Sequence, residues 1–237
     1  MRVALTRSSE DAAATAARLA ALGFSPVFAP ALAIRPTGIA QPAGAFDALI
    51  ATSAAAFTAL PAERYAPLAT LPLYVVGERT AESAVAIGLS KPRAVAAGAA
   101  ILAALVCDRL RQNARVLHIA GRDRTPGLEE ALIAAGHRLV IWEVYEATAR
   151  EAWSAAEAQA FSEADAALFY SRRSAELVVV LAERAGLREH FQHILTVCIS
   201  ENAAEPLRGA GVKNIAIAAQ PTEAGLLEAL KQRARAP

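Results

Sequence analysis

Residues 19–23 read LAALG and residues 132–136 read LIAAG, so the chain repeats a short motif 113 positions further along. The same offset pairs Arg2 with Arg115 without a gap. In both copies a glycine ends a stretch rich in alanine and leucine, as is typical of the C-terminus of a helix. The pattern predicts an internal duplication, and the fold follows from what each copy contains.

Later segments of the two copies align as well. They are FDALIATSAAAF (46–57) with ADAALFYSRRSA (164–175), and LYVVGERTAESAVAIG (73–88) with TVCISENAAEPLRGAG (196–211). In the first pair Asp47 lies over Asp165, so the offset has grown to 118, as a loop insertion would make it. Each copy then has roughly 110 residues, enough for about one compact domain.

Composition indicates a folded protein of the cytoplasm. The chain has 237 residues, of which 55% are hydrophobic, so it can bury one large core or two small ones. Its longest apolar run, residues 94–107, is shorter than the roughly 18 to 20 residues that span a bilayer, and no apolar signal-peptide core follows Arg2. A net charge of +1 without a basic block argues against nucleic acid as a partner.

The cysteines and histidines predict neither a disulfide nor a metal site. Cys107 and Cys198 lie in separate apolar runs, where buried reduced thiols are expected. His190 and His193 are three positions apart, but no further cysteine or carboxylate except Glu189 is near them in the sequence.

Short apolar runs alternate with amphipathic stretches throughout the chain, which is typical of βαβ units with parallel sheets. Ten strand candidates divide into two sheets of five. They are residues 2–6, 27–34, 47–51, 73–77, 93–97, 115–120, 138–147, 165–170, 195–199 and 214–218. In the second copy, Thr125 and Pro126 are expected to begin the helix that ends at Gly136.

Two arrangements of domains fit this pattern. Two tandem domains would meet near residue 113. Alternatively, the extended segments 27–44 and 139–153 are connectors that cross between lobes. Lobe 1 is then discontinuous and comprises residues 1–35 plus 150–237. Lobe 2 is continuous and comprises residues 36–149. Periodicity alone does not choose between the two.

Candidate binding residues follow the strands, because ligands of open parallel sheets bind beyond the carboxyl ends of the strands. Hydroxyl groups, arginines and glycine recur there, a set that suits carboxylates or phosphates. The candidates are Arg7, Thr52, Ser53, Thr80, Gly121, Arg122, Arg124, Ser171, Arg172, Asn202 and Thr222. Taken singly, a hydroxyl or amide side chain at such a turn is more often a helix cap.

Several ligand classes are disfavoured by missing motifs. The chain has no GxGxxG and no GxxxxGK[ST], so dinucleotides and nucleoside triphosphates are not expected. Tyr145 in WEVYEA lies where a strand becomes a connector, and a phenol there can donate a proton. Packing at a domain junction is the alternative interpretation of Tyr145.

Taken in order, seven segments resemble the uroporphyrinogen-III synthase family over essentially the whole chain. They are VALTR (3–7), FDALIATSAAAF (46–57), LYVVGERTAESAVAIG (73–88), VLHIAGRDRTPGLEEALIAAGH (116–137), VYEA (144–147), ALFYSRRSAE (167–176) and QPTEAGLLEAL (220–230). The resemblance implies two flavodoxin-like, three-layer α/β lobes, each a five-stranded parallel sheet, joined by two extended connectors. It also implies an enzyme without a cofactor that closes hydroxymethylbilane to uroporphyrinogen III, inverting the last pyrrole ring and losing water.

The resemblance also assigns roles. The substrate is a tetrapyrrole with eight carboxylates, expected in a cleft between the lobes. By similarity, Thr80, Ser171, Thr52 and Ser53 are expected to bind it. Tyr145 is expected to donate the proton that lets the hydroxyl group leave. The arginines Arg7, Arg122 and Arg124 are expected to anchor carboxylates.

Asn202 departs from the pattern, because many relatives have threonine in this loop. A monomer without a nucleic acid or membrane partner is expected, and contact with the enzyme that makes the substrate is left open. A competing interpretation is a two-lobed binding or effector protein without catalysis. A nucleotide-using α/β enzyme is a third possibility that the missing glycine loops disfavour.

Overall fold

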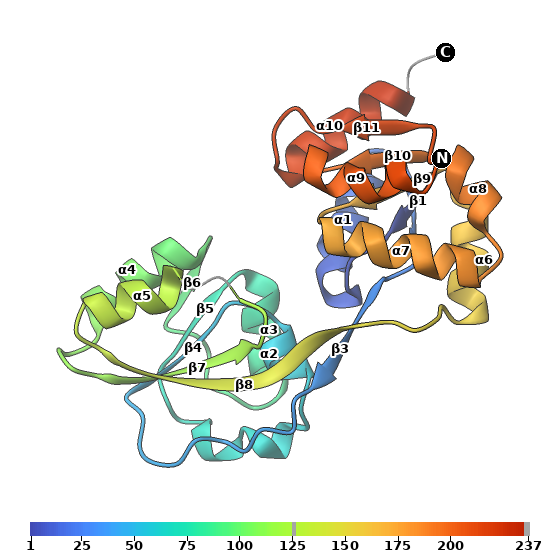
Figure 1. Ribbon diagram of the computed structural model, residues 1–237. Helices are drawn as coiled ribbons and strands as arrows, with labels where there is room; N and C mark the ends of the chain where they lie inside the picture. The colour runs from blue at the N-terminus through green and yellow to red at the C-terminus, as the bar shows by residue number, and fades with distance from the viewer. Residues whose placement is uncertain (125–126, 235–237) are drawn as a thin grey trace. The chain divides into compact units, whose positions relative to one another are not determined.

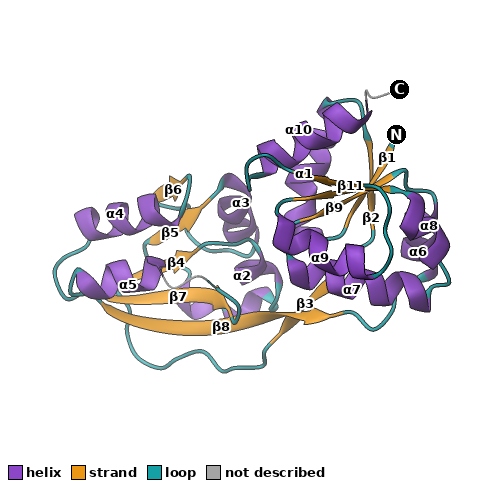
Figure 2. Cartoon of the chain, turned by 45° about the horizontal axis from the view of Figure 1, so that its top comes forward, coloured by secondary structure: helices purple, strands orange, loops and turns teal. Residues whose placement is uncertain are grey.

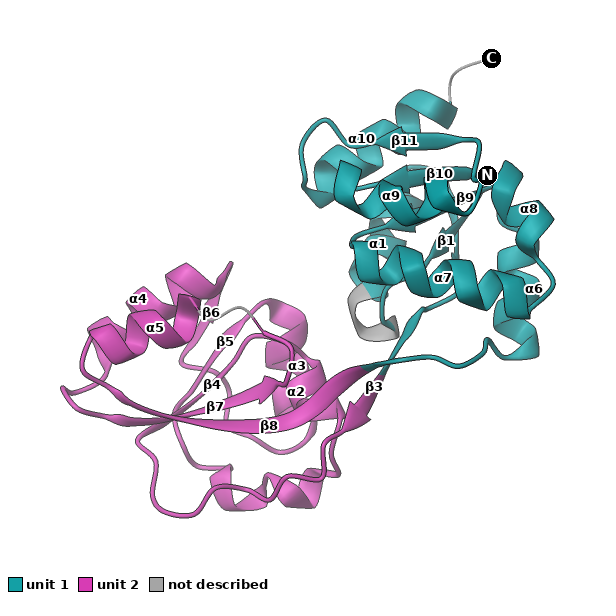
Figure 3. Ribbon diagram, viewed as in Figure 1, with its two compact units in different colours: residues 1–33, 148–237 teal, residues 34–147 magenta. Residues whose placement is uncertain are grey.

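The computed structural model describes residues 1–124 and 127–234 (Figure 1). Thr125 and Pro126, expected to begin a helix, lie outside these residues. The chain forms two compact units: residues 1–33 with 148–237 are unit 1, and residues 34–147 are unit 2 (Figure 3). The α/β class predicted from the sequence is confirmed.

Unit 1 has a five-stranded parallel sheet in the order β11-β10-β9-β1-β2. Its strands are β1 (Arg2–Leu5), β2 (Ser25–Phe28), β9 (Ala166–Phe169), β10 (Leu195–Cys198) and β11 (Ile215–Ile217). Its helices are α1 (Ser9–Ala21), α6 (Ala155–Ser162), α7 (Arg172–Arg184), α8 (Arg188–His193), α9 (Glu201–Gly209) and α10 (Glu223–Ala234). Helices cover both faces of the sheet, so the unit has three layers (Figure 2).

Each face of this sheet has its own hydrophobic core. Phe161, Val178 and Leu207 belong to the cluster under α6, α7 and α9. Leu19 and Leu226 belong to the cluster under α1 and α10. Because the central strands are covered on both faces, β9 is apolar throughout and β1 is apolar after the exposed Arg2.

Unit 2 has six strands in the order β3-β8-β7-β4-β5-β6. They are β3 (Leu32–Pro36), β4 (Ala48–Ala51), β5 (Leu73–Val76), β6 (Ala94–Ala96), β7 (Arg115–Gly121) and β8 (Arg138–Ala149). The helices are α2 (Ala55–Thr58), α3 (Glu78–Ala86), α4 (Ala99–Arg109) and α5 (Gly127–Ala134), with two short 3-10 turns, η1 (Ala62–Arg64) and η2 (Ala66–Leu68). Two cores again flank the sheet, one around Phe57, Tyr65 and Trp142 and one around Leu102 and Leu132.

The prediction of five parallel strands in this lobe is wrong. The sixth strand arises because the two connecting segments pair with each other: the Thr37 N–H donates to the Val144 carbonyl at 3.1 Å, and the Arg150 N–H donates to the Ala31 carbonyl at 3.0 Å. Residue numbers increase along one segment while those of their hydrogen-bond partners decrease along the other. Strand β3 therefore runs antiparallel to β8. Two adjacent extended segments satisfy their backbone polar groups by pairing, and no helix is needed between antiparallel strands.

The internal duplication is visible in the order of the strands. By the sequence offsets, β1 and β2 correspond to β7 and β8, whereas β4, β5 and β6 correspond to β9, β10 and β11. Unit 1 reads β2-β1-β9-β10-β11 and unit 2 reads β8-β7-β4-β5-β6 beside β3, which is the same order. Each unit therefore combines the first two strands of one copy with the last three strands of the other.

A matching aspartate joins the two parts of each sheet. Asp165 Oδ2 accepts the Arg2 backbone N–H at 2.6 Å in unit 1, and Asp47 Oδ2 accepts the Arg115 backbone N–H at 2.7 Å in unit 2. The Arg115 N–H and the Arg111 guanidinium hold the pKa of the Asp47 carboxyl below its ordinary range. These equivalent aspartates have a structural role at the amino-terminal edge of each sheet.

Candidate active site

The carboxyl ends of the strands bring the predicted site residues into two groups. Because β1, β9, β10 and β11 are parallel neighbours, the residues after them share one edge of the unit 1 sheet. This first group is Arg7, Ser171, Arg172, Asn202 and Thr222. The strands β4, β5, β7 and β8 bring a second group to one edge of unit 2: Thr52, Ser53, Thr80, Gly121, Arg122, Arg124 and Tyr145.

The hydroxyl groups of the first group cap helices. Ser171 Oγ accepts the Ser174 N–H at 3.1 Å at the start of α7, and Thr222 Oγ1 accepts the Gly225 N–H at 3.1 Å at the start of α10. Asn202 is exposed in the first turn of α9. A capping hydroxyl uses a lone pair, and its own hydrogen can still be donated to a carboxylate. Capping is therefore compatible with binding.

The two arginines of the first group differ in their surroundings. The Arg7 guanidinium lies over the Tyr170 ring, 4.5 Å from its centroid, which holds the cation at the end of β1. Arg172 pairs with Glu176 at 2.8 Å and also with Glu205, so its charge is already balanced by two carboxylates on α7 and α9.

Tyr145 lies directly over Gly121. A Cβ placed on Gly121 would be 2.6 Å from Cε2 and Cζ of the Tyr145 ring and 2.9 Å from its hydroxyl oxygen. The register between β7 and β8 shifts at this point, from Ala120 opposite Glu143 to Gly121 opposite Tyr145. Such bulges re-aim side chains and are common next to active sites. The phenol is half-buried at the carboxyl edge of the sheet, where a proton donor could meet a ligand.

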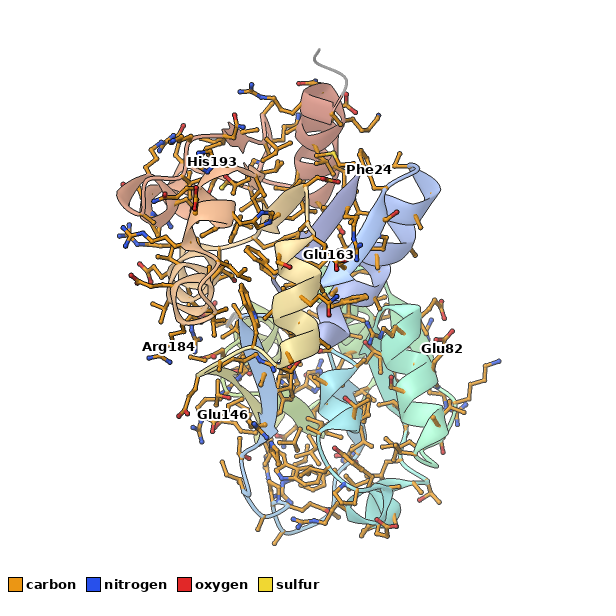
Figure 4. All side chains as sticks on the ribbon, turned by 90° about the vertical axis from the view of Figure 1, so that its right-hand side faces the viewer. Phe24, Glu82, Glu146, Glu163, Arg184 and His193 are labelled. Atoms are coloured by element: carbon orange, nitrogen blue, oxygen red, sulfur yellow. The ribbon has the colours of Figure 1, made fainter. Side chains whose placement is uncertain are left out.

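Glutamates surround the arginines of the β7–α5 loop. Arg124 pairs with Glu129 at 2.6 Å and with Glu143 at 2.7 Å, and it also donates to the Gly121 carbonyl at 3.0 Å. Arg122 pairs with Glu146, labelled in Figure 4. Arg124 is mostly buried and donates to the Gly121 and Arg122 carbonyls, so it fixes residues 121–124.

His118 extends this network into the core. Its Nδ1 lies 3.1 Å from Glu129 Oε1, and its side chain is only 3% exposed. Burial lowers the pKa of the His118 imidazole, so the neutral ring is favoured, although Glu129 opposes the shift. A neutral ring that donates from Nδ1 holds the Glu129 carboxylate in place for Arg124.

The remaining hydroxyls of the second group lie after β4 and β5. Ser53 Oγ accepts the Ala55 N–H at 3.3 Å, and Thr52 is exposed beside it. Thr80 lies in the first turn of α3 and is 4% exposed, so little of its side chain can meet a ligand. The first N–H groups of α3 have no acceptor within the helix, and such groups bind anions.

The model of one protein family, described as uroporphyrinogen-III synthase HemD, matches residues 13–228. The chain belongs to the uroporphyrinogen-III synthase family. It is therefore an enzyme of haem biosynthesis that makes uroporphyrinogen III. The family acts on a tetrapyrrole substrate.

Solved structures of uroporphyrinogen-III synthases resemble the chain over nearly their whole length. The Helicobacter pylori enzyme is 18% identical, with 99% of this chain and 100% of that chain covered and a TM-score of 0.57, which shows a shared fold. The wild-type Thermus thermophilus enzyme is 22% identical, with 99% of each chain covered and a TM-score of 0.44. A search of curated proteins found no significant match.

Sequence reasoning missed the glutamates that pair with Arg122 and Arg124, and the histidine beside them. His118 and Glu143 interrupt the apolar strands RVLHIAG and RLVIWEVYEATA, and that interruption is the signal that could have identified them. The described residues contain no group of three or more side chains suited to a metal ion. They contain no helix long and apolar enough to cross a membrane either.

Proposed function

We propose that Tyr145 donates the proton with which the hydroxyl group of hydroxymethylbilane leaves as water. The electrophilic azafulvene that remains is attacked by the substituted carbon of the last ring, and the resulting spiro intermediate fragments and recloses with that ring inverted. The protein must hold the flexible chain so that this carbon, and not the free one, meets the electrophile. Orientation supplies most of the effect.

The contact between Tyr145 and Gly121 carries this proposal. A side chain at position 121 would push the phenol away, and the bulge in β8 places the ring over that bare backbone. The Arg122 N–H donates to the Tyr145 carbonyl at 2.9 Å, which ties the tyrosine to the loop that Arg124 braces. The phenol is therefore held in one position, as a general acid requires.

We further propose that the substrate's carboxylates bind to the strand-end donors. Arg7, the hydroxyls of Thr52, Ser53, Ser171 and Thr222, and the N-terminal N–H groups of α3 are suited to this role. Asn202 can add an amide donor, and Thr80 contributes to a lesser extent because it is buried. Arg122, Arg124 and Arg172 already pair with glutamates, so we assign Arg124 to bracing the loop and expect Arg122 and Arg172 to bind only by exchanging partners.

The finer architecture is proposed on the strand order. Within unit 1 the strands follow the order 2-1-3-4-5, which supports a flavodoxin-like winding for that unit. The strands of unit 2 that correspond to them by the sequence offsets lie in the same order, so we propose the same winding there. A monomer of the cytoplasm that works without a cofactor is likewise our proposal. That the tetrapyrrole lies between the two units stays a prediction from the family resemblance.

Isomer analysis tests the assignment of Tyr145. Hydroxymethylbilane is generated in situ, the protein is added, the products are oxidised, and the isomers are separated. The wild type should give an excess of isomer III, and Tyr145→Phe should slow its formation by about 10²-fold or more, the typical contribution of a general acid. Tyr74→Phe, on the buried strand β5 of the same unit, is the matched control and should keep the wild-type rate. Equal rates for wild type and Tyr145→Phe would remove Tyr145 from the mechanism.

A further inference from the structure

A second polar cavity lies at the amino-terminal edge of the unit 2 sheet. It has a volume of about 400 Å³, and its lining includes Asp47, Arg111, Asn113, Arg115 and Arg138. Strand β7 begins at this edge with Arg115 and ends at Gly121. Strand β8 begins beside it with Arg138 and continues past Tyr145. The cavity is therefore separated from the candidate active site by the length of these strands.

The cavity concentrates positive charge. Three guanidinium groups face the single carboxylate of Asp47, which gives the lining a net charge of +2, whereas the whole chain carries only +1. Guanidinium groups bind carboxylates and phosphates through pairs of parallel hydrogen bonds. A volume of this size is within the range of small-molecule sites.

Arg115 is fixed before any ligand arrives. Its guanidinium donates to the Ala43 carbonyl at 2.9 Å and the Ala45 carbonyl at 3.1 Å, and it lies 4.6 Å from the centroid of the Phe46 ring. A Cβ on Gly44 would lie 2.1 Å from its Nη1, so glycine is needed for this close approach. The segment 43–46 thus wraps around the charge and immobilises it.

The other two arginines are tethered but keep donors. Arg138 donates from Nε to Asn113 Oδ1 at 2.8 Å, and Arg111 donates from Nη2 to Asp47 Oδ1 at 2.9 Å. Among the residues that the structure describes, neither side chain makes another hydrogen bond, so both terminal nitrogens of Arg138 and Nη1 of Arg111 remain for a ligand. Tethering lowers the entropy that ordering these side chains would cost.

The equivalent edge of unit 1 shows that the fold does not require these arginines. Both edges have the hydrogen bond between an aspartate and a backbone N–H. In unit 2 the residue paired in register with Arg115 is Arg138. In unit 1 the equivalent position, paired with Arg2, is Ser25. By the offset of 118, Ala45 is replaced by Glu163, which is labelled in Figure 4. Glu163 pairs with Arg2 at 2.5 Å. At the unit 1 edge, Arg2 thus faces two carboxylates, Glu163 and Asp165, whereas the duplicated edge of unit 2 is strongly basic.

We propose that the arginine cavity of unit 2 binds a small, multiply charged oxyanion, either a phosphate or a polycarboxylate, at a site separate from that of catalysis. Arg138 and Arg111 supply the free donors, and Arg115 supplies a fixed charge behind them. Ala45, which stands where unit 1 has a glutamate, leaves the cavity open and basic.

Titration calorimetry tests the site with inorganic phosphate, pyrophosphate and citrate, with potassium chloride used to keep the ionic strength constant. We expect saturable binding of at least one multivalent anion and none of acetate. Binding of phosphate and pyrophosphate alone would assign the site to phosphates, and binding of citrate alone would assign it to polycarboxylates. Arg138→Ala and Arg111→Ala should each weaken binding by roughly tenfold, since each removes charge-assisted hydrogen bonds.

Two further variants make the test specific. Ala45→Glu places the glutamate of the unit 1 edge in the cavity and lowers the net charge of the lining from +2 to +1. It should weaken binding strongly while isomer III is still formed at the wild-type rate. Arg233→Ala removes the same charge from the exposed end of α10 and should bind the anion as the wild type does. Absence of saturation up to millimolar anion, or equal affinity in the wild type and Ala45→Glu, would overturn the proposal.

Discussion

Gly121→Ala should inactivate the enzyme through Tyr145 and leave the fold largely intact. The new methyl group would lie 2.6 Å from two carbons of the phenol ring, whereas carbon atoms pack at about 3.5 to 4.0 Å. The ring must therefore move by about 1 Å. A misplacement of about 1 Å near reacting groups lowers the rate by about 10²-fold. Overpacking at one site costs only about 1 to 3 kcal/mol in the free energy of unfolding.

The assay is the rate of isomer III formation with substrate generated in situ, measured alongside urea denaturation. Gly98→Ala is the control in the same unit, because a Cβ on Gly98 meets nothing within 4 Å and its backbone is extended; it should keep full activity. The decisive comparison is made in a Tyr145→Phe background, where the hydroxyl is already missing and Gly121→Ala should lower the rate far less.

Two results would refute the reasoning. A wild-type rate for Gly121→Ala would show that the close contact does not hold the phenol in a productive position. An equal loss of rate in the presence and absence of the Tyr145 hydroxyl would show that Gly121 acts independently, for instance by direct contact between its backbone and the substrate.

Three further outcomes are expected. Thr6→Val should lower the free energy of unfolding by about 1 to 3 kcal/mol in urea denaturation, because the fully buried Thr6 hydroxyl donates to the Leu168 carbonyl at 2.7 Å. A thiol reagent should modify Cys107 in the folded protein but reach Cys198 only on unfolding, since burial raises the pKa of the Cys198 thiol to about 12. Burial lowers the pKa of His118 in the folded state, so the unfolded state takes up the proton first. The free energy of unfolding should therefore fall as the pH drops below the ordinary value of 6.5, and less steeply in His118→Asn.

Each of these outcomes has a matching control. Thr6→Ser keeps the donor and should recover most of the stability lost in Thr6→Val; equal stability of all three proteins would contradict the hydrogen bond. Simultaneous modification of both thiols in the folded protein would show that Cys198 is accessible. An unchanged pH slope in His118→Asn would show that another group governs the acid side of the stability curve.

The sequence predicts the broad architecture because the duplication and the alternation of apolar runs are local patterns. The central strands β1, β4, β7 and β9 lie within two residues of their expected bounds, since strands buried on both faces are short apolar runs. The aspartates at 47 and 165, the first residues of two expected strands, directly precede β4 and β9 in the structure. In the structure the chain passes between the units after residues 33 and 147. The crossed arrangement has these boundaries two residues later, after 35 and 149.

Pairing between distant segments could not be predicted in the same way. The segment 27–34 reads as one apolar run, yet it divides into β2 and β3, which belong to different sheets. Nothing local shows that β3 pairs with β8, because periodicity specifies faces and not partners. The glutamate partners of Arg122 and Arg124 were missed for a similar reason: they come from β8 and α5, and only the fold brings them to the loop.

The exchange of segments between the two copies imposes an order on folding during synthesis. The strands of unit 2 end with β8 at Ala149, whereas the sheet of unit 1 sets β1 beside β9 and is completed only when β11 has left the ribosome. Residues 1–33 therefore remain without β9, the partner of the apolar strand β1, until unit 2 has been translated. Strand β1 is thus made before all of unit 2 and is among the last strands to reach its native place.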